Sequence, residues 1–265
     1  MNLSGIIIAI LVVGAVGLFI GLFLGLAGKK FAVWTDPREE EVLEALPGNN
    51  CGACGYPGCS GLAAAIAKDE ADIAACPVGG QPVADVIATI MGVEVQQAQR
   101  NVAYVKCGGT CETAKQSYNY TGIEDCVMMN MMQDGGPKAC SYGCLGGGTC
   151  VKVCPFDAID IINNIAVINK EACRACEKCV AACPKHIIEM IPYEQNYFVT
   201  CESKEKAKDV MAVCSVGCIA CKRCEKACEF DAIHVVDNIA HIDTKKCTNC
   251  GACFEVCPKK IIYRV

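Results

Sequence analysis

Residues 218–228 read CIACKRCEKAC and residues 247–258 read CTNCGACFEVCP. Each stretch places four cysteines at the spacing C-x2-C-x2-C-x3-C. The layout recurs upstream, because eight cysteines between positions 140 and 183 each have a cysteine 74 positions later. Self-similarity at a fixed offset indicates two copies of one structural unit. The matched pairs are Cys140 with Cys214, Cys144 with Cys218, Cys150 with Cys224, Cys154 with Cys228, Cys173 with Cys247, Cys176 with Cys250, Cys179 with Cys253, and Cys183 with Cys257.

The second copy resembles the bacterial two-cluster ferredoxins, in which the fourth cysteine of each run ligates the other cluster. It departs from that family at Glu229, where Pro is usual, but the ligand spacing survives. Two neighbouring zinc ions are the alternative, and the crossed, dense spacing favours iron–sulfur chemistry. The resemblance implies one [4Fe–4S] cluster on Cys218, Cys221, Cys224 and Cys257, and another on Cys247, Cys250, Cys253 and Cys228.

The first copy lacks one ligand. Cys173, Cys176 and Cys179 with Cys154 form a regular set, but the position that matches Cys221 is Gly147. Only Cys144, Cys150 and Cys183 remain at matching positions for the other cluster. We expect Cys140 to be the fourth ligand, with the triglycine around Gly147 letting the loop fold differently; a three-iron cluster or a non-cysteine ligand is the competing possibility.

A further group of cysteines precedes the repeats, with the spacing C-x2-C-x4-C-x16-C. Glycines around its first three members allow backbone amides to approach inorganic sulfide closely. A structural zinc site also uses four thiolates, but it usually presents two separated pairs of ligands. We therefore expect a [4Fe–4S] cluster held by Cys51, Cys54, Cys59 and Cys76.

Five of the 25 cysteines remain unassigned. Val105-Lys106-Cys107 and Val199-Thr200-Cys201 look like the same element at the opening of each copy. A sixth cluster through Cys107, Cys111 and Cys126 is possible, whereas Cys201 and Cys214 are expected to be buried structural thiols.

The N-terminus predicts a membrane anchor. Residues 5–26 are almost entirely apolar, and as a helix they would extend about 33 Å, enough to cross the hydrocarbon core of a bilayer. A secretory signal peptide is the rival interpretation, but no basic region precedes the apolar stretch. Lys29 and Lys30 follow at once, so the positive-inside rule predicts a single-pass protein of the cell membrane with its cysteine-rich body in the cytoplasm. The reducing cytoplasm disfavours disulfides.

Composition limits the other possibilities. Cysteine makes up 25 of 265 residues, and 29 acidic residues against 24 Lys and Arg give a net charge of −5. Without a basic excess, a general nucleic-acid binder is excluded. No paired carboxylates, nucleophile–base constellation or phosphate-binding loop is recognisable, so we expect no independent catalytic site in this chain.

These features predict an α+β protein: a single transmembrane helix, a small α-helical [4Fe–4S] domain and two tandem bacterial-type two-cluster ferredoxin modules. The expected boundaries are the anchor at 1–28, the N-terminal cluster domain at 29–92, a cysteine-containing linker at 93–139, the first module at 140–191, a linker at 192–213 and the second module at 214–265.

In this combination the chain resembles the B subunit of the Rnf complex, an ion-translocating ferredoxin:NAD oxidoreductase. The resemblance implies that it accepts electrons from reduced soluble ferredoxin and relays them through about five [4Fe–4S] clusters to membrane and peripheral subunits with flavin and NAD sites, coupled to Na⁺ or H⁺ translocation. Two alternatives remain: a membrane-anchored reductase arm that keeps an iron–sulfur sensor reduced, and a zinc-stabilised, non-redox membrane adaptor.

Basic residues gather near the modules, where they could simply balance the cluster charge or dock an acidic ferredoxin. They are Arg174, Lys178 and Lys185 in the first copy, and Lys222, Arg223, Lys226, Lys245, Lys246, Lys259 and Lys260 in the second.

Overall fold

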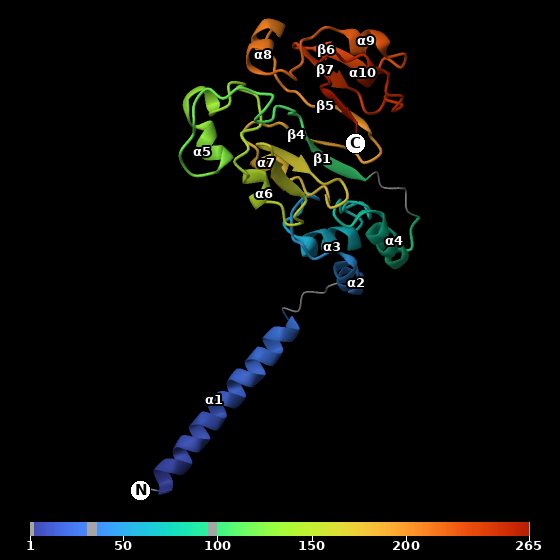
Figure 1. Ribbon diagram of the computed structural model, residues 1–265. Coiled ribbons are helices and arrows are strands. Elements are labelled where there is room, and N and C mark those ends of the chain that lie inside the picture. The colour runs from blue at the N-terminus through green and yellow to red at the C-terminus, as the bar shows by residue number, and fades with distance from the viewer. Residues whose placement is uncertain (1–2, 31–35, 95–99, 265) are drawn as a thin grey trace.

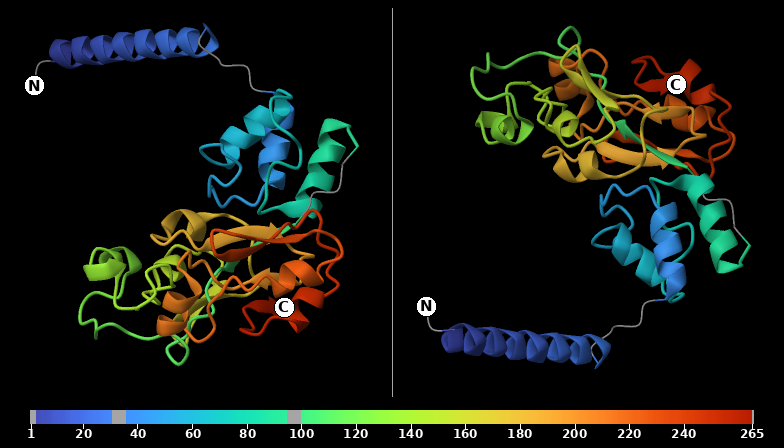
Figure 2. Two further views of the ribbon diagram at one scale, coloured as in Figure 1. Left: turned by 90° about the horizontal axis from the view of Figure 1, so that it is seen from above. Right: turned by 90° about the horizontal axis from the view of Figure 1, so that it is seen from below.

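The computed structural model describes residues 3–30, 36–94 and 100–264. Three parts follow one another along the chain: a long helix, a group of short helices, and a body of small sheets and helical turns (Figure 1). The two views in Figure 2 show the group of short helices lying between the long helix and that body. The mixture of helices and strands agrees with the expected α+β class.

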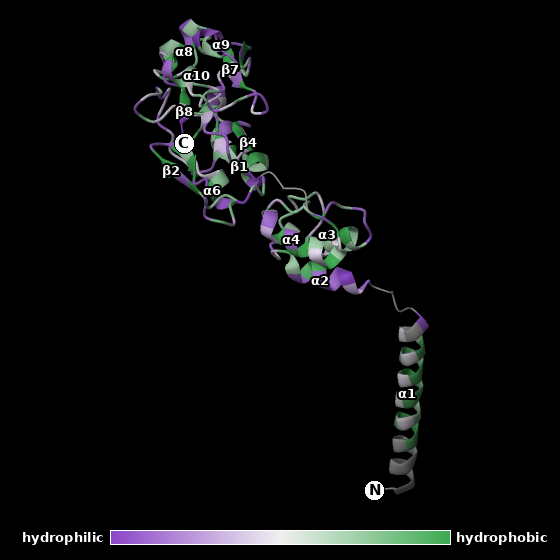
Figure 3. Cartoon of the chain, turned by 90° about the vertical axis from the view of Figure 1, so that its right-hand side faces the viewer, coloured by the Kyte–Doolittle hydropathy of each residue, from purple (hydrophilic) through white to green (hydrophobic). Residues whose placement is uncertain are grey.

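The long helix α1 spans Leu3–Lys30, 28 residues or about 42 Å. Its window Leu11–Gly28 is long and apolar enough to cross a membrane, and none of that window is buried against the rest of the protein. Figure 3 shows no strongly hydrophilic residue along this window, whereas the other parts of the chain mix hydrophilic and hydrophobic residues. A helix with apolar residues all round requires an apolar environment outside the chain itself.

Three short helices follow: α2 (Pro37–Ala45), α3 (Cys59–Ala67) and α4 (Gly80–Met91). Asp36 begins α2 by accepting a hydrogen bond from the backbone N–H of Arg38 at 2.9 Å, and Pro37 occupies the first helical position. The helices pack around a small core that is buried almost completely. Its largest members are Val42, Leu62, Ile66 and Ile87.

Each repeat copy forms two antiparallel strand pairs. In the first copy, β1 (Asn101–Val105) pairs with β4 (Ile188–Pro192), and β2 (Ile159–Ile162) pairs with β3 (Ile165–Ile168). In the second copy, β5 (Tyr197–Val199) pairs with β8 (Ile262–Arg264), and β6 (Ile233–Val236) pairs with β7 (Ile239–Ile242). Asn163 and Asn164 turn the first hairpin with positive φ angles of 50° and 64°, as a two-residue type I′ turn requires.

Both copies therefore reach further upstream than the repeat of cysteines. Strands β1 and β5 lie in the segments 93–139 and 192–213, which the sequence led us to expect as linkers, yet each hydrogen-bonds to the last strand of its copy. An unpaired edge strand would leave its backbone polar groups without partners, which explains why the closing strand of each copy recruits the opening one.

Within the described residues, short helical elements complete the two copies, and five of them carry one cysteine each. The elements are α5 (Cys126–Asn130), the 3₁₀ turn η1 (Gln133–Gly135), α6 (Thr149–Lys152), α7 (Lys178–Ala182), α8 (Ala207–Val213), α9 (Arg223–Ala227) and α10 (Ala252–Glu255).

Candidate metal centres

The second copy brings its two expected thiol sets together. One cavity is lined by Cys218, Cys221, Cys224 and Cys257, so the last cysteine of the C-terminal run crosses to the first set. A second cavity is lined by Cys228, Cys247, Cys250 and Cys253, which completes the exchange. The crossed grouping is the one that the ferredoxin resemblance implies.

The regular set of the first copy also converges. Burial and, after it, the neighbouring thiols of Cys173, Cys176 and Cys154 together raise the pKa of the Cys179 thiol to about 12. Cys173 and Cys179 are buried, and the backbone N–H of Ala103 donates to the sulfur of Cys173 at 3.5 Å. Strand β1 thus supplies a hydrogen-bond donor to this set.

The irregular set of the first copy lines a cavity together with a different cysteine from the one expected. A cavity is lined by Cys126, Cys144, Cys150 and Cys183. Burial and, after it, the nearby thiols of Cys144, Cys126 and Cys183 together raise the pKa of the Cys150 thiol to about 12. Cys140, the expected fourth ligand, lines a neighbouring cavity instead.

The absence of a side chain at Gly147 lets Cys126 approach the cavity that Cys144, Cys150 and Cys183 line. A Cβ at position 147 would lie 2.9 Å from the backbone nitrogen of Cys126 and 2.9 Å from the sulfur of Met129. The loop has not refolded around the triglycine: Gly146 and Gly148 have φ of 73°, and the corresponding Ala220 and Lys222 are also left-handed, at 52° and 58°. Our expectation of a differently folded loop was wrong in this respect, because the chain keeps its turn and replaces only the side chain.

A signal for Cys126 was present in the sequence. Cys201 and Cys214 are 13 positions apart, but Cys107 and Cys140 are 33 positions apart, so the first copy carries 20 additional residues in the interval that contains Cys126. A comparison at fixed offset finds no counterpart for a ligand that arrives in an insertion.

The N-terminal domain gathers its cysteines where α3 begins. Burial raises the pKa of the Cys76 thiol, and the nearby thiols of Cys54 and Cys59 contribute in the same direction. The backbone N–H of Gly79 donates to the sulfur of Cys76 at 3.4 Å. Cys51 lies close enough to Cys176 of the first copy to influence its pKa, so the two thiol sets are neighbours.

The donor sets suit iron–sulfur clusters better than single metal ions. In the described part of the chain, no three His, Cys, Asp or Glu side chains are grouped so that they could hold one metal ion. A tetrahedral zinc needs all four sulfurs about 2.3 Å from one point, whereas here the thiols line the walls of cavities. Donors aimed at sulfur, such as the N–H of Ala166 to Cys144 at 3.4 Å, are the kind of contact that tunes a cluster's potential.

Comparisons with known proteins agree with this division. Two family models, both described as "4Fe-4S dicluster domain", match residues 136–184 and 217–261, and a model described as "Putative Fe-S cluster" matches residues 46–78. Three iron–sulfur domains of ferredoxin-like character therefore follow one N-terminal apolar helix.

Similar proteins cover nearly the whole chain. The B subunit of the Na⁺-translocating ferredoxin:NAD⁺ oxidoreductase complex of Acetobacterium woodii is 47% identical over 98% of this chain and 78% of the relative. The B subunit of the ion-translocating oxidoreductase complex of Methanosarcina acetivorans is 42% identical over 98% of both chains. The B subunit of the proton-translocating ferredoxin:NAD⁺ oxidoreductase complex of Clostridium ljungdahlii is 40% identical over 99% of this chain and 94% of the relative. The chain thus belongs to the family of B subunits of Rnf-type ion-translocating oxidoreductase complexes.

Proposed function

We propose that this chain is the electron-transfer subunit of a membrane-bound Rnf-type complex. It accepts electrons from reduced ferredoxin and relays them to flavin- and NAD-linked partner subunits, coupled to translocation of Na⁺ or H⁺. The protein contributes spacing, burial and hydrogen bonds to sulfur, while [4Fe–4S] clusters supply one-electron redox chemistry when bound. The observation that carries the proposal is that thiol sets from different domains adjoin, since Cys54 and Cys76 of the N-terminal domain line one cavity together with Cys173 of the first copy.

The ligand sets that we assign to clusters follow from the cavities and the neighbouring thiols. They are Cys51, Cys54, Cys59 and Cys76; Cys154, Cys173, Cys176 and Cys179; Cys126, Cys144, Cys150 and Cys183; Cys218, Cys221, Cys224 and Cys257; and Cys228, Cys247, Cys250 and Cys253.

The second module is suited to receive electrons from a soluble donor. Its ligands Cys221 and Cys250 are exposed, whereas the exposed cysteine of the first copy, Cys111, belongs to none of the five sets. Figure 1 places this module at the end of the molecule remote from α1. A donor that docks there would bring its cluster close to a ligand at the surface.

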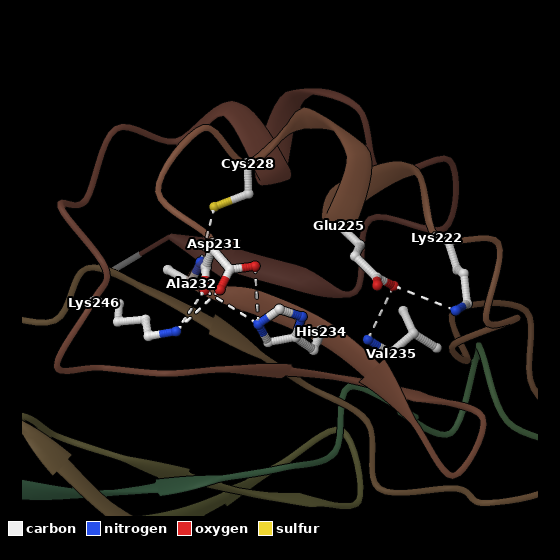
Figure 4. Close-up of polar contacts among 8 residues, drawn as sticks. All are labelled: Lys222, Glu225, Cys228, Asp231, Ala232, His234, Val235 and Lys246. Atoms are coloured by element: carbon white, nitrogen blue, oxygen red, sulfur yellow. Dashed lines mark hydrogen bonds and ion pairs between the residues drawn. The ribbon is translucent and has the colours of Figure 1, made fainter.

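The charges around this module favour an acidic donor. Lys246 is paired with Asp231 at 3.0 Å, and Lys222 lies 3.8 Å from Glu225; dashed lines mark both pairs in Figure 4. Within the described residues, the exposed Lys226 forms no such ion pair, and it lies on α9, which also carries Cys224. Unpaired lysines are free to attract a negatively charged protein, and attraction of this kind weakens as salt screens it.

The helix α1 would anchor the electron-transfer subunit in the membrane. We propose that α1 spans the bilayer once, with Lys29 and Lys30 and the cysteine-rich body on the cytoplasmic side. The window Leu11–Gly28 contains no ionisable residue, so the ion path belongs to partner subunits rather than to this helix.

The test uses the full-length chain, purified without oxygen. We expect iron and acid-labile sulfide in equal amounts and EPR signals of reduced clusters after mixing with reduced ferredoxin. The rate of cluster reduction should fall as ionic strength rises. Zinc without sulfide, or clusters that reduced ferredoxin leaves oxidised, would overturn the proposal.

A further inference from the structure

A further cavity lies between the two modules and is lined by four cysteines outside the five sets described above. Cys107 and Cys140 come from the first copy, and Cys201 and Cys214 come from the second. Its volume, counted with the space that is open to solvent, is about 420 Å³, compared with 340–350 Å³ for the three module cavities described above. The cavity is therefore no smaller than the sites that the ferredoxin pattern predicts.

The four sulfurs approach one another across the module boundary. A Cβ on Gly109 would lie 3.6 Å from the sulfur of Cys107 and 3.6 Å from that of Cys214. Cys140 lines the same cavity as these two thiols. Cys201 completes the lining from the second copy. Each copy thus presents two thiols to a shared space.

The two halves of the cavity are built alike. Cys107 follows β1 and Cys201 follows β5, while Cys140 and Cys214 are equivalent positions of the repeat. The N–H of Cys144 donates to the sulfur of Cys107 at 3.3 Å, and the N–H of its counterpart Cys218 donates to the sulfur of Cys201 at 3.4 Å. The two copies therefore give Cys107 and Cys201 the same kind of hydrogen bond, and both thiols line the same cavity.

Backbone pairing holds the two halves together. The N–H of Gly108 donates to the carbonyl of Thr200 at 2.8 Å, which ties the segment after β1 to the segment after β5. Ala114 forms an antiparallel bridge with Cys214, and the N–H of Lys115 donates to the carbonyl of Val213 at 2.9 Å. These bonds fix the ligands of one module against those of the other.

A buried lysine indicates the charge of the occupant. Lys138 is only 2% exposed, and its ammonium donates to the carbonyl of Gly109 at 2.7 Å. It forms no ion pair with a carboxylate in the part of the chain that the structure describes, although lysines are almost never fully buried unless they are paired. The side chain lines the same cavity as the four thiols. An anion at that place would supply the missing partner.

We propose that Cys107, Cys140, Cys201 and Cys214 hold a sixth [4Fe–4S] cluster between the modules, with Lys138 as its buried counter-charge. Four thiolates and an oxidised cluster carry a net charge of about −2. The cavity is also lined by Lys106 and Glu202, which pair with each other, so among the described residues Lys138 is the lining cation that no carboxylate neutralises. Hydrogen bonds from Cys144 and Cys218 to its ligands connect it to the adjacent cluster of each module. The site therefore bridges two redox modules that would otherwise face each other across a cavity.

The iron count tests this directly on the full-length chain, purified without oxygen with its clusters in place. We expect about 24 iron and 24 sulfide per chain, where five clusters would give about 20 of each. The double variant Cys140→Ala/Cys214→Ala should lose about four of each, and one cluster signal should disappear from an EPR-monitored redox titration. Cys111→Ala, at an exposed cysteine outside every set, is the matched control and should retain all the iron.

The variant Lys138→Met keeps every thiol and removes only the charge. It should retain the iron of the wild type while one midpoint potential moves to a more negative value. The inference is overturned if the wild-type chain holds about 20 iron atoms, or if the double variant holds as much iron as the wild type. It is also overturned if the wild type contains zinc that is absent from the double variant. Those results would leave the other five clusters and the proposed function intact, whereas a chain without sulfide would defeat both.

Discussion

The backbone nitrogen of Cys126 lies 2.9 Å from the point that a Cβ on Gly147 would occupy. Because Gly147 has no side chain, Cys126 from another segment can approach Cys144, Cys150 and Cys183. Thr149 fixes the arrangement, since its hydroxyl accepts from the N–H of Cys126 at 2.7 Å and donates to the carboxylate of Asp125 at 2.9 Å. Asp125 in turn caps α5 through the N–H of Val127.

Cys126→Ala should therefore remove a ligand from the first module and leave the second module intact. We expect a loss of about one to four iron atoms per chain and, after oxidation, the EPR signal of a three-iron cluster. Gly147→Ala should act in the same direction, because its new methyl group would meet the backbone at Cys126 and Asp125. A full complement of iron in Cys126→Ala would show that another residue supplies the fourth ligand.

The contrast between the two module sites shows what the sequence could predict. The crossed sets of the second copy, the hairpin at Asn163–Asn164 and the shared opening element before Cys107 and Cys201 all follow from local spacing or from the fixed offset. Cys126 could not be found by offset, because it arrives in an insertion without a counterpart. The cavity between the modules was equally hidden, since its four thiols come from four segments whose spacings match no motif.

Lys106 joins the two modules electrostatically. Its ammonium lies 3.2 Å from the carboxylate of Glu189 on β4 and 2.5 Å from that of Glu202, which follows β5, and the lysine side chain is only 13% exposed. Lys106→Met would leave both carboxylates without their cation. We expect a loss of about 2 kcal/mol in the free energy of unfolding, measured by anaerobic denaturation. Lys68→Met, at an exposed lysine of the N-terminal domain, should change it little.

The ion pairs of Lys106 with Glu189 and Glu202 also make the stability of the fold depend on pH. Burial lowers the pKa of Lys106, but the hydrogen bond to Glu202 and the charges of Glu189 and Glu202 outweigh it, so the net effect is a rise above 10.5. A raised lysine pKa stabilises the fold fully below pH 10.5, and this contribution is lost as the pH rises through the folded-state value. The difference in stability between wild type and Lys106→Met should therefore be constant near neutral pH and shrink above pH 10.5. A difference that stays unchanged well above pH 10.5 would contradict this assignment.

Docking of ferredoxin should depend on the lysines of the second module that form no ion pair within the described residues. Lys226→Glu combined with Lys260→Glu should slow cluster reduction by reduced ferredoxin at low ionic strength, and the difference from wild type should vanish as salt is added. Lys246→Gln is a matched control, because Asp231 already neutralises that lysine. Stopped-flow absorbance would measure the rates. Equal rates for the charge-reversed and wild-type proteins at low salt would place the docking surface elsewhere.

Cys111 should be the one thiol of the loaded protein that alkylating reagents reach. It is exposed and lies outside both the five sets and the cavity between the modules, whereas 24 of the 25 cysteines are assigned to clusters. A thiolate that ligates iron has its nucleophilic lone pair engaged, so exposure alone does not make Cys221 or Cys250 reactive. Mass spectrometry after brief anaerobic treatment with N-ethylmaleimide should show a single adduct, at Cys111, and none in Cys111→Ala. Additional adducts at Cys107, Cys140, Cys201 or Cys214 would mean that these thiols are free and that the cavity between the modules holds no cluster.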